Sequence, residues 1–173
     1  AKRLGDMGDC FLALERHDVG LVILGDVENK IEHPRIRYCG FIAPHELPSY
    51  YRGADVMLHL AYTDWCPNAV VEALACGVPV ITTHNGGVPE LVQGSGIVIK
   101  NESDYNKEFV DFRNLPKVNP ALVAEAVDII LDDPRQFVYD RPDLSMKRCG
   151  AQYLKFFRKV VAHEEANDKG GSS

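Results

Sequence analysis

The sequence predicts an α/β fold built on a doubly wound parallel sheet. Two observations support this prediction: short apolar runs recur over the first hundred residues, and segments with helical patterns separate them. Continuous apolarity, rather than alternation, is typical of strands covered on both faces, as in a parallel sheet. Strands that alternate with helices are joined by right-handed crossovers, and the resulting sheet carries helices on both faces.

The strands and crossover helices follow one another in order along the chain. We expect strands at 21–25 (LVILG), 36–42 (IRYCGFI), 56–61 (VMLHLA), 79–84 (PVITTH) and 96–99 (GIVI). Between them, crossover helices are expected within 44–54 (PHELPSYYRGA), 67–77 (PNAVVEALACG) and 88–94 (VPELVQG).

The last third of the chain has a different pattern. Residues 100–120 are polar and end in two prolines, which predicts a long surface loop. A helix is expected within 120–134, with Pro120 in its first turn and Pro134 just past its end. A longer amphipathic helix follows, with Asp143 or Ser145 as its N-cap. We expect its apolar stripe to dock onto the sheet; the stripe comprises Tyr153, Phe156, Phe157 and Val160.

Composition limits the classes of function. A chain of 173 residues is expected to form one domain, here 1–163, followed by a tail at 164–173 that we expect to be disordered. The net charge of −6 argues against general binding of nucleic acid or of anionic membranes. No uninterrupted apolar stretch approaches the roughly 18 residues of a membrane span, and no signal peptide opens the chain.

Cysteine usage indicates the compartment. The five cysteines are widely spaced, with no C-x-x-C pair and no Cys/His cluster at zinc spacing. We therefore expect free thiols in a reducing cytosol and no structural metal. The chain opens without a methionine and ends in DKGGSS, which favours a domain cut from a longer protein.

The segment 64–77, DWCPNAVVEALACG, carries the candidate chemistry. Pro67 suits a first helical position and Gly77 suits the left-handed residue that closes a helix. This helix directly follows an expected strand, so its N-terminus lies at the carboxyl edge of the sheet, where ligands bind in such folds. Free amides at Asn68, Ala69 and Val70 would make that N-terminus a phosphate site.

Glu72 lies in the apolar middle of the same helix. An ionised carboxylate among apolar neighbours is costly unless it accepts good hydrogen bonds. Two interpretations stay open: the side chain points to solvent from one face, or it accepts hydrogen bonds from a ribose diol. A second loop on the same rim contains Gly86 and Gly87 at the end of an expected strand. These glycines permit either a close approach to ligand or an ordinary tight turn.

Together these residues resemble the donor-binding domain of retaining glycosyltransferases of the GT-B fold, family 4 (group 1). The matching blocks are LVILGD, IRYCGFI, LPSYYRGADVMLHLA, DWCPNAVVEALACGVPVITTHNGGVPELV and GIVI, which cover roughly 21–99. The resemblance implies a Rossmann-like doubly wound parallel sheet, the C-terminal half of a GT-B fold. The terminal helices match the family more loosely.

The resemblance implies roles for individual residues. The family carries two acids eight positions apart, which here are Asp64 and Glu72. Glu72 matches the acid that binds the ribose hydroxyls, and Asp64 matches the catalytic acid that faces the transferred sugar. The family usually has glutamate at that first position, so the role of the shorter Asp64 is less secure.

The turn between the acids differs from the glycine-rich turn common in the family. It reads Trp65, Cys66, Pro67, Asn68, and Pro67 lacks an amide, so Cys66, Asn68 and Ala69 would supply the contacts to the donor. Residues Gly40, Phe41 and Ile42 follow the strand that borders the nucleobase in the family, although Phe41 could equally belong to the core. We also place Gly86 and Gly87 among the donor-binding residues.

The resemblance further implies what lies outside the matched block. A basic pair that neutralises the diphosphate in the family precedes the block, and neither Lys2, Arg3 nor Arg16 aligns with it. The N-terminal acceptor domain is also absent, so we expect this chain alone to be inactive. The acceptor, whether a glycan, a lipid or a small molecule, would bind through that missing domain.

The resulting hypothesis is the donor-binding domain of a hexosyltransferase that uses a nucleoside diphosphate sugar, with no metal and no other cofactor. The expected location is the cytoplasm, with peripheral association at the cytoplasmic face of a membrane as an option for the full-length enzyme, and no nucleic acid as partner. Two alternatives stay open: a sugar-nucleotide epimerase or phosphorylase of the same fold, and a non-catalytic binding domain of GT-B type.

Overall fold

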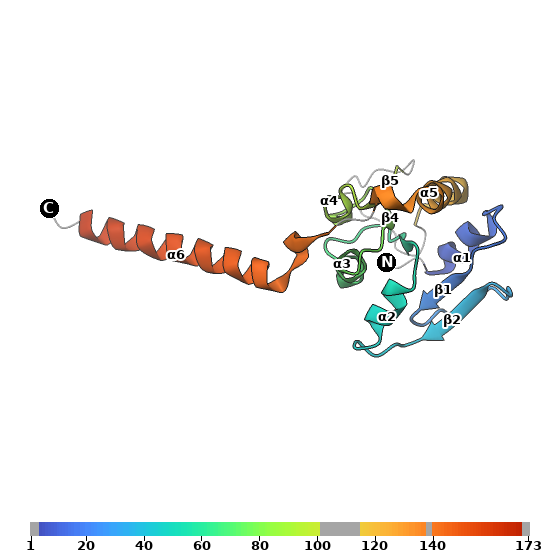
Figure 1. Cartoon of the computed structure of the whole chain (residues 1–173). Coiled ribbons are helices and arrows are strands. Elements are labelled where there is room, and N and C mark those ends of the chain that lie inside the picture. Colours follow the sequence, from blue (N-terminus) through green and yellow to red (C-terminus); the bar gives the residue numbers. More distant parts are fainter. Residues whose placement is uncertain (1–3, 101–114, 138–139, 171–173) are drawn as a thin grey trace. The chain divides into compact units, whose positions relative to one another are not determined.

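The computed structural model describes residues 4–100, 115–137 and 140–170 (Figure 1). Most of the expected loop at 100–120 lies outside these ranges. The chain divides into two compact units, Ala1–Tyr139 and Asp140–Ser173, and the single domain expected over 1–163 stays a prediction.

The first unit is an α/β structure with parallel strands, which confirms the predicted class. Strands β1 (Leu21–Leu24) and β2 (Ile36–Gly40) form a two-stranded parallel sheet. Strands β3 (Met57–His59), β4 (Val80–Thr83) and β5 (Gly96–Ile99) form a second parallel sheet in that order. Among the described residues no pairing joins β1 to β3, so the five strands form two sheets where one was expected.

The described part of the first unit contains five α-helices. They are α1 (Leu4–Leu12), α2 (Leu47–Arg52), α3 (Asn68–Ala75), α4 (Val88–Val92) and α5 (Pro120–Asp132). Helix α5 packs against α1, β4 and β5, while α3 contacts α2, α4, β3 and β4, so the helices form two groups about the second sheet (Figure 1). Leu60, Ile81 and Ile130 are buried in the core on the α5 side.

The start of α5 agrees with the prediction and the end of β2 differs from it, each for a physical reason. Asn119 caps α5, because its side-chain oxygen accepts a hydrogen bond from the Ala121 amide at 3.0 Å, and Pro120 occupies the first turn as predicted. Strand β2 ends two residues earlier than expected. Gly40 has a φ of +65°, a left-handed conformation that interrupts the extended backbone before Phe41.

The sequence analysis missed helix α1. Its inward face follows the helical spacing i, i+3, i+4, i+7 through Met7, Cys10, Phe11 and Leu14. Cys10 and Phe11 are buried, and Phe11 packs with Ile23 and Ile36 from the two strands of the first sheet. The helix therefore joins the core around β1 and β2 to the core around α5.

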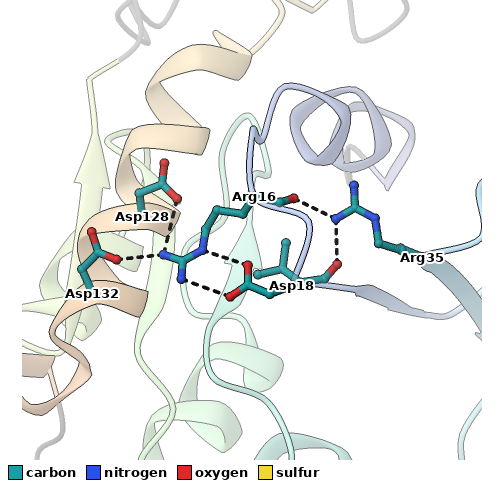
Figure 2. A network of polar contacts seen from close by, with 6 residues as sticks. Arg16, Asp18, Arg35, Asp128 and Asp132 are labelled. Atoms are coloured by element: carbon teal, nitrogen blue, oxygen red, sulfur yellow. Dashed lines mark hydrogen bonds and ion pairs between the residues drawn. The ribbon is translucent and has the colours of Figure 1, made fainter.

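An arginine network links the segment after α1 to α5 and β2 (Figure 2). The Arg16 guanidinium donates to the Asp18 carboxylate at 3.2 and 3.3 Å and to Asp132 at 2.8 Å. The Arg35 guanidinium donates to the carbonyl oxygens of Arg16 and Val19 at 2.8 and 3.0 Å. Hydrogen bonding to Arg16 holds the pKa of Asp18 below its usual value. Arg16 is thus committed to a structural network.

The second unit contains a short 3₁₀-helix at Pro142–Leu144 and helix α6 (Met146–Gly170). The Ser145 carbonyl accepts from the Cys149 amide at 2.9 Å, which places Ser145 at the N-cap position and excludes Asp143 from it. The backbone helix extends to Gly170, through most of the segment expected to be a disordered tail.

The apolar stripe of α6 is exposed within the second unit, and its predicted docking onto the sheet of the first unit stays a prediction. Tyr153 and Phe156 are each 60% exposed, and Phe157 is 56% exposed. The aromatic rings pack on one another, since the Tyr153 and Phe157 rings stack with centroids 6.1 Å apart. Within the described residues, no helix combines the length and the apolarity required to cross a membrane.

Candidate functional site

Two loops meet at the carboxyl ends of β3 and β4. The Gly87 amide donates to the Asp64 carbonyl at 3.0 Å, and Asp64 and Gly86 form an isolated parallel bridge. Gly86 has a φ of +89°, and a Cβ atom there would overlap the Asp64 backbone. A Cβ atom at Gly87 would overlap the Trp65 carbonyl. The close approach of the two loops therefore explains both glycines without a ligand.

A further hydrogen bond holds the loop after β3 against β4. The Thr83 hydroxyl donates to the Ala61 carbonyl at 2.7 Å, and both residues are buried. The loops after β3 and β4, here called the rim, are therefore joined by the Thr83–Ala61 and Gly87–Asp64 hydrogen bonds. These bonds position the residues between Asp64 and the start of α3.

Helix α3 begins one residue later than predicted. Pro67 occupies the N-cap position with φ −71° and ψ 124°, and its carbonyl accepts from the amides of Val70 and Val71 at 3.1 and 3.3 Å. The prediction of a free Val70 amide is therefore wrong. The amides of Asn68 and Ala69 donate to no other residue within the described part of the chain. The N-terminus of α3 thus presents two amides and the positive end of its dipole.

The other end of α3 follows the prediction. Gly77 has a φ of +76°, and its amide donates to the Leu74 carbonyl at 3.0 Å. This is the left-handed closure expected of a glycine just past a helix. The Pro67 and Gly77 positions therefore frame a helix of eight residues with Glu72 on its exposed side.

Glu72 is exposed and has a protein partner that the sequence analysis missed. The Tyr51 hydroxyl, at the end of α2, donates to the Glu72 Oε2 atom at 3.1 Å. Burial raises the pKa of Tyr51 to about 12, and the hydrogen bond to Glu72 raises it in the same direction. The two residues are 21 positions apart. Only the packing of α2 against α3 brings them together, so no local pattern could have indicated the pair.

Asp64 faces a buried histidine that was likewise missed. The Nε2 atom of His59, the last residue of β3, lies 3.6 Å from the Asp64 Oδ2 atom. The histidine side chain is 11% exposed and the aspartate side chain 32% exposed. A polar residue at the carboxyl end of an apolar strand was the available signal for His59. When protonated, it would place a positive charge beside the carboxylate predicted to be catalytic.

The other predicted site residues lie in two places. Trp65 is 70% exposed on the rim, and Cys66 beside it is an exposed free thiol; all five cysteines are free. Gly40 ends β2, in the other sheet, and Phe41 and Ile42 follow it; the Gly25 amide donates to the Gly40 carbonyl at 2.7 Å. Phe41 is 84% exposed, so the alternative that it belongs to the core is wrong.

The three basic residues considered for the diphosphate are not placed at the N-terminus of α3 by the described part of the structure. Lys2 and Arg3 lie outside the described residues, and Arg16 is held in the network beside α5 (Figure 2). The described ranges also contain no group of three or more His, Cys, Asp or Glu side chains placed to hold a metal ion.

Comparison with known proteins identifies a family: the one described as "Glycosyl transferases group 1" matches residues 9–112. D-inositol 3-phosphate glycosyltransferase from Streptomyces bingchenggensis (strain BCW-1) is 39% identical over 119 residues, which are 66% of this chain and 25% of that protein.

Two solved structures share the fold at low sequence identity. Sucrose-phosphate synthase from Thermosynechococcus elongatus has a TM-score of 0.62 at 19% identity, covering 94% of this chain and 43% of the other. Anabaena HepE in complex with UDP-glucose has a TM-score of 0.60 at 16% identity, covering 95% and 45%.

The lengths of these proteins define what the match covers. The chain spans a quarter of the length of the Streptomyces relative and less than half of each solved structure. Its fold matches somewhat less than half of each of these two solved structures. With the family matching well over half of its residues, the chain belongs to the group 1 glycosyltransferases.

Proposed function

We propose that the protein binds a nucleoside diphosphate sugar at the N-terminus of α3 and serves a retaining transfer of a hexose to an acceptor hydroxyl. One observation carries this proposal: α3 presents two amides that have no acceptor among the described residues, and the same helix carries an exposed carboxylate. Asn68 and Glu72 are four residues apart, which is about 6 Å along the helix axis. A ribose 5′-diphosphate spans such a separation, with its phosphates at the amides and its hydroxyls at Glu72.

The chemistry of each group supports its role. A helix N-terminus binds phosphate oxygens through its amides and dipole, without any cation. An ionised carboxylate is only an acceptor, so Glu72 suits the two hydroxyl donors of a ribose diol. HepE, which shares the fold, has been solved with UDP-glucose, a ligand of the donor class proposed here.

Asp64 is the residue we assign to the reaction centre. It lies at the rim, directly before the turn that leads to the α3 amides, and its carboxylate is partly exposed. In the proposed transfer, the departing diphosphate is stabilised by the amides while Asp64 faces the positive charge that develops on the sugar. Analysis of the products formed from the donor, with and without phosphate, separates transfer from epimerisation and phosphorolysis.

The substitution Glu72→Ala tests the donor site. We expect the variant to bind nucleoside diphosphates about 100-fold more weakly or worse, because two hydrogen bonds to a charged acceptor are lost. Isothermal titration calorimetry with UDP, GDP and ADP measures the affinity, and circular dichroism checks the fold. Glu90→Ala removes an equally exposed carboxylate from the neighbouring helix α4 and is the matched control. Unchanged affinity in Glu72→Ala would exclude the ribose assignment.

A further inference from the structure

We infer that Tyr51 is a positioning residue for donor binding: its hydroxyl holds the Glu72 carboxylate in the orientation that accepts the ribose hydroxyls. This inference rests on the proposed function and adds a residue from a different helix to the site. It predicts that Tyr51 affects affinity only for ligands that carry ribose hydroxyls.

The Tyr51 side chain is well placed to act as a fixed support. Tyr51 is 8% exposed and is the one buried residue of α2. Helix α2 packs against α3, and the phenol ring is enclosed while its oxygen reaches Glu72 Oε2 at 3.1 Å. Because an ionised carboxylate has no proton to give, the hydroxyl is the donor in this bond.

The contact with Tyr51 lowers the conformational entropy that the Glu72 side chain would lose on binding a ligand. A glutamate side chain on a helix surface samples several rotamers, and immobilising it costs conformational entropy. With Oε2 held by Tyr51, part of that cost is already met before the ligand arrives, while Oε1 makes no hydrogen bond to the described residues and can accept one from a ligand. Preorganisation of this kind raises affinity without adding a contact to the ligand.

The Tyr51 hydroxyl keeps its proton at neutral pH. Burial, followed by the bond to Glu72, raises the pKa of Tyr51 to about 12, so the group stays a neutral donor at neutral pH. Deprotonation of Tyr51 would bring a second negative charge next to the carboxylate. The pair therefore functions in one protonation state.

A purely structural role for the same bond is the competing explanation. Tyr51 could simply hold α2 against α3. In that case its removal would lower the affinity for all ligands of α3 by the same factor, or for none of them. The two explanations differ in one measurable quantity, the ratio of the affinities for a ribose ligand and for its dideoxy analogue. This ratio is taken within one sample of protein, so a change in the fraction of folded molecules does not alter it.

The experiment measures this ratio in four proteins. UDP, GDP and ADP, each with its 2′,3′-dideoxy analogue, are titrated into the unmodified protein and into Tyr51→Phe, Tyr50→Phe and Glu72→Gln. Tyr50 is the matched control, because it precedes Tyr51 on α2 and its hydroxyl makes no hydrogen bond to the described residues. Tyr51→Phe keeps the buried ring and removes only the hydroxyl.

The expected result is a graded loss of ribose preference. The ratio should fall about 3- to 10-fold in Tyr51→Phe, the modest effect of losing one rather long hydrogen bond to a charged group. It should fall further in Glu72→Gln, whose carboxamide keeps only one, uncharged acceptor oxygen, and stay unchanged in Tyr50→Phe. If Glu72→Gln lowers the preference but Tyr51→Phe leaves it intact, the inference about Tyr51 is wrong and the proposed site stands. If Glu72→Gln also leaves it intact, the ribose assignment is wrong and both proposals are overturned.

Discussion

At the residue scale, the Glu72 carboxylate changes the acidity of the Tyr51 hydroxyl. Burial is the main reason that the pKa of Tyr51 is raised from 10.0 to about 12, and the hydrogen bond and charge of Glu72 add to it. Because the folded value lies above the unfolded one, unfolded chains lose the proton first as pH rises. The stability from this group is therefore fully present below about pH 10 and is lost progressively toward pH 12.

This pair predicts a specific response to alkaline titration. In Glu72→Gln, the pKa of Tyr51 should fall from about 12, yet stay above 10.0, because the charge and its hydrogen bond are lost while burial remains. NMR of protein with ¹³C label on the tyrosine ζ carbon follows the titration. Tyr51→Phe identifies the Tyr51 signal among the seven tyrosines. An identical titration curve in Glu72→Gln would show that the two groups do not interact in solution.

Asp64 illustrates how a shorter side chain is fixed by its surroundings. Its carbonyl accepts from the Gly87 amide and its carboxylate faces His59 Nε2 at 3.6 Å. The backbone is thereby tied to the turn after β4 and the side chain to the end of β3. The aspartate therefore has a defined place on the rim, which is a requirement for any role at a reaction centre.

At the element scale, the close packing of the two rim loops requires glycine at position 86. Gly86→Ala should lower the free energy of unfolding by about 1–3 kcal/mol from the left-handed backbone alone, and more from the overlap with Asp64. Urea unfolding measures the loss. Gly20→Ala is the control, because a Cβ atom there would meet the Arg35 carbonyl at an ordinary 3.4 Å. Equal stability of the two variants would contradict the described packing of the loops.

Local signals predicted α3 well and were less informative elsewhere for identifiable reasons. Pro67 and Gly77 act through backbone geometry, so the helix they frame was placed to within a residue at each end. The apolar face of α6 was visible in the sequence, but a pattern of this kind does not name the surface that covers it. The docking of this stripe onto the sheet therefore stays a prediction.

The same limit applies to the site. Glu72 and Asp64 stand out because charged residues within or beside an apolar helix need partners. Their partners Tyr51 and His59 come from neighbouring elements, and such tertiary contacts leave no trace in local spacing. The structure explains Gly86 and Gly87 by loop packing, which the sequence could not distinguish from the approach of a ligand, and their role in donor binding stays a prediction.

At the scale of the whole molecule, every candidate residue lies in the first unit. Within the described residues, the rim, α3 and the segment after β2 follow parallel strands of the two sheets. The arginine network joins α5 to the segment after α1. The proposed donor site is built from residues of this unit, Ala1–Tyr139.

The most direct test of the central proposal is a crystal structure of the protein with the nucleoside diphosphate that binds it most tightly. We predict that the ribose hydroxyls lie within hydrogen-bonding distance of the Glu72 carboxylate, with Tyr51 still on Oε2. The diphosphate should accept hydrogen bonds from the Asn68 and Ala69 amides. A nucleotide bound elsewhere, or one with its ribose turned away from Glu72, would contradict the proposal.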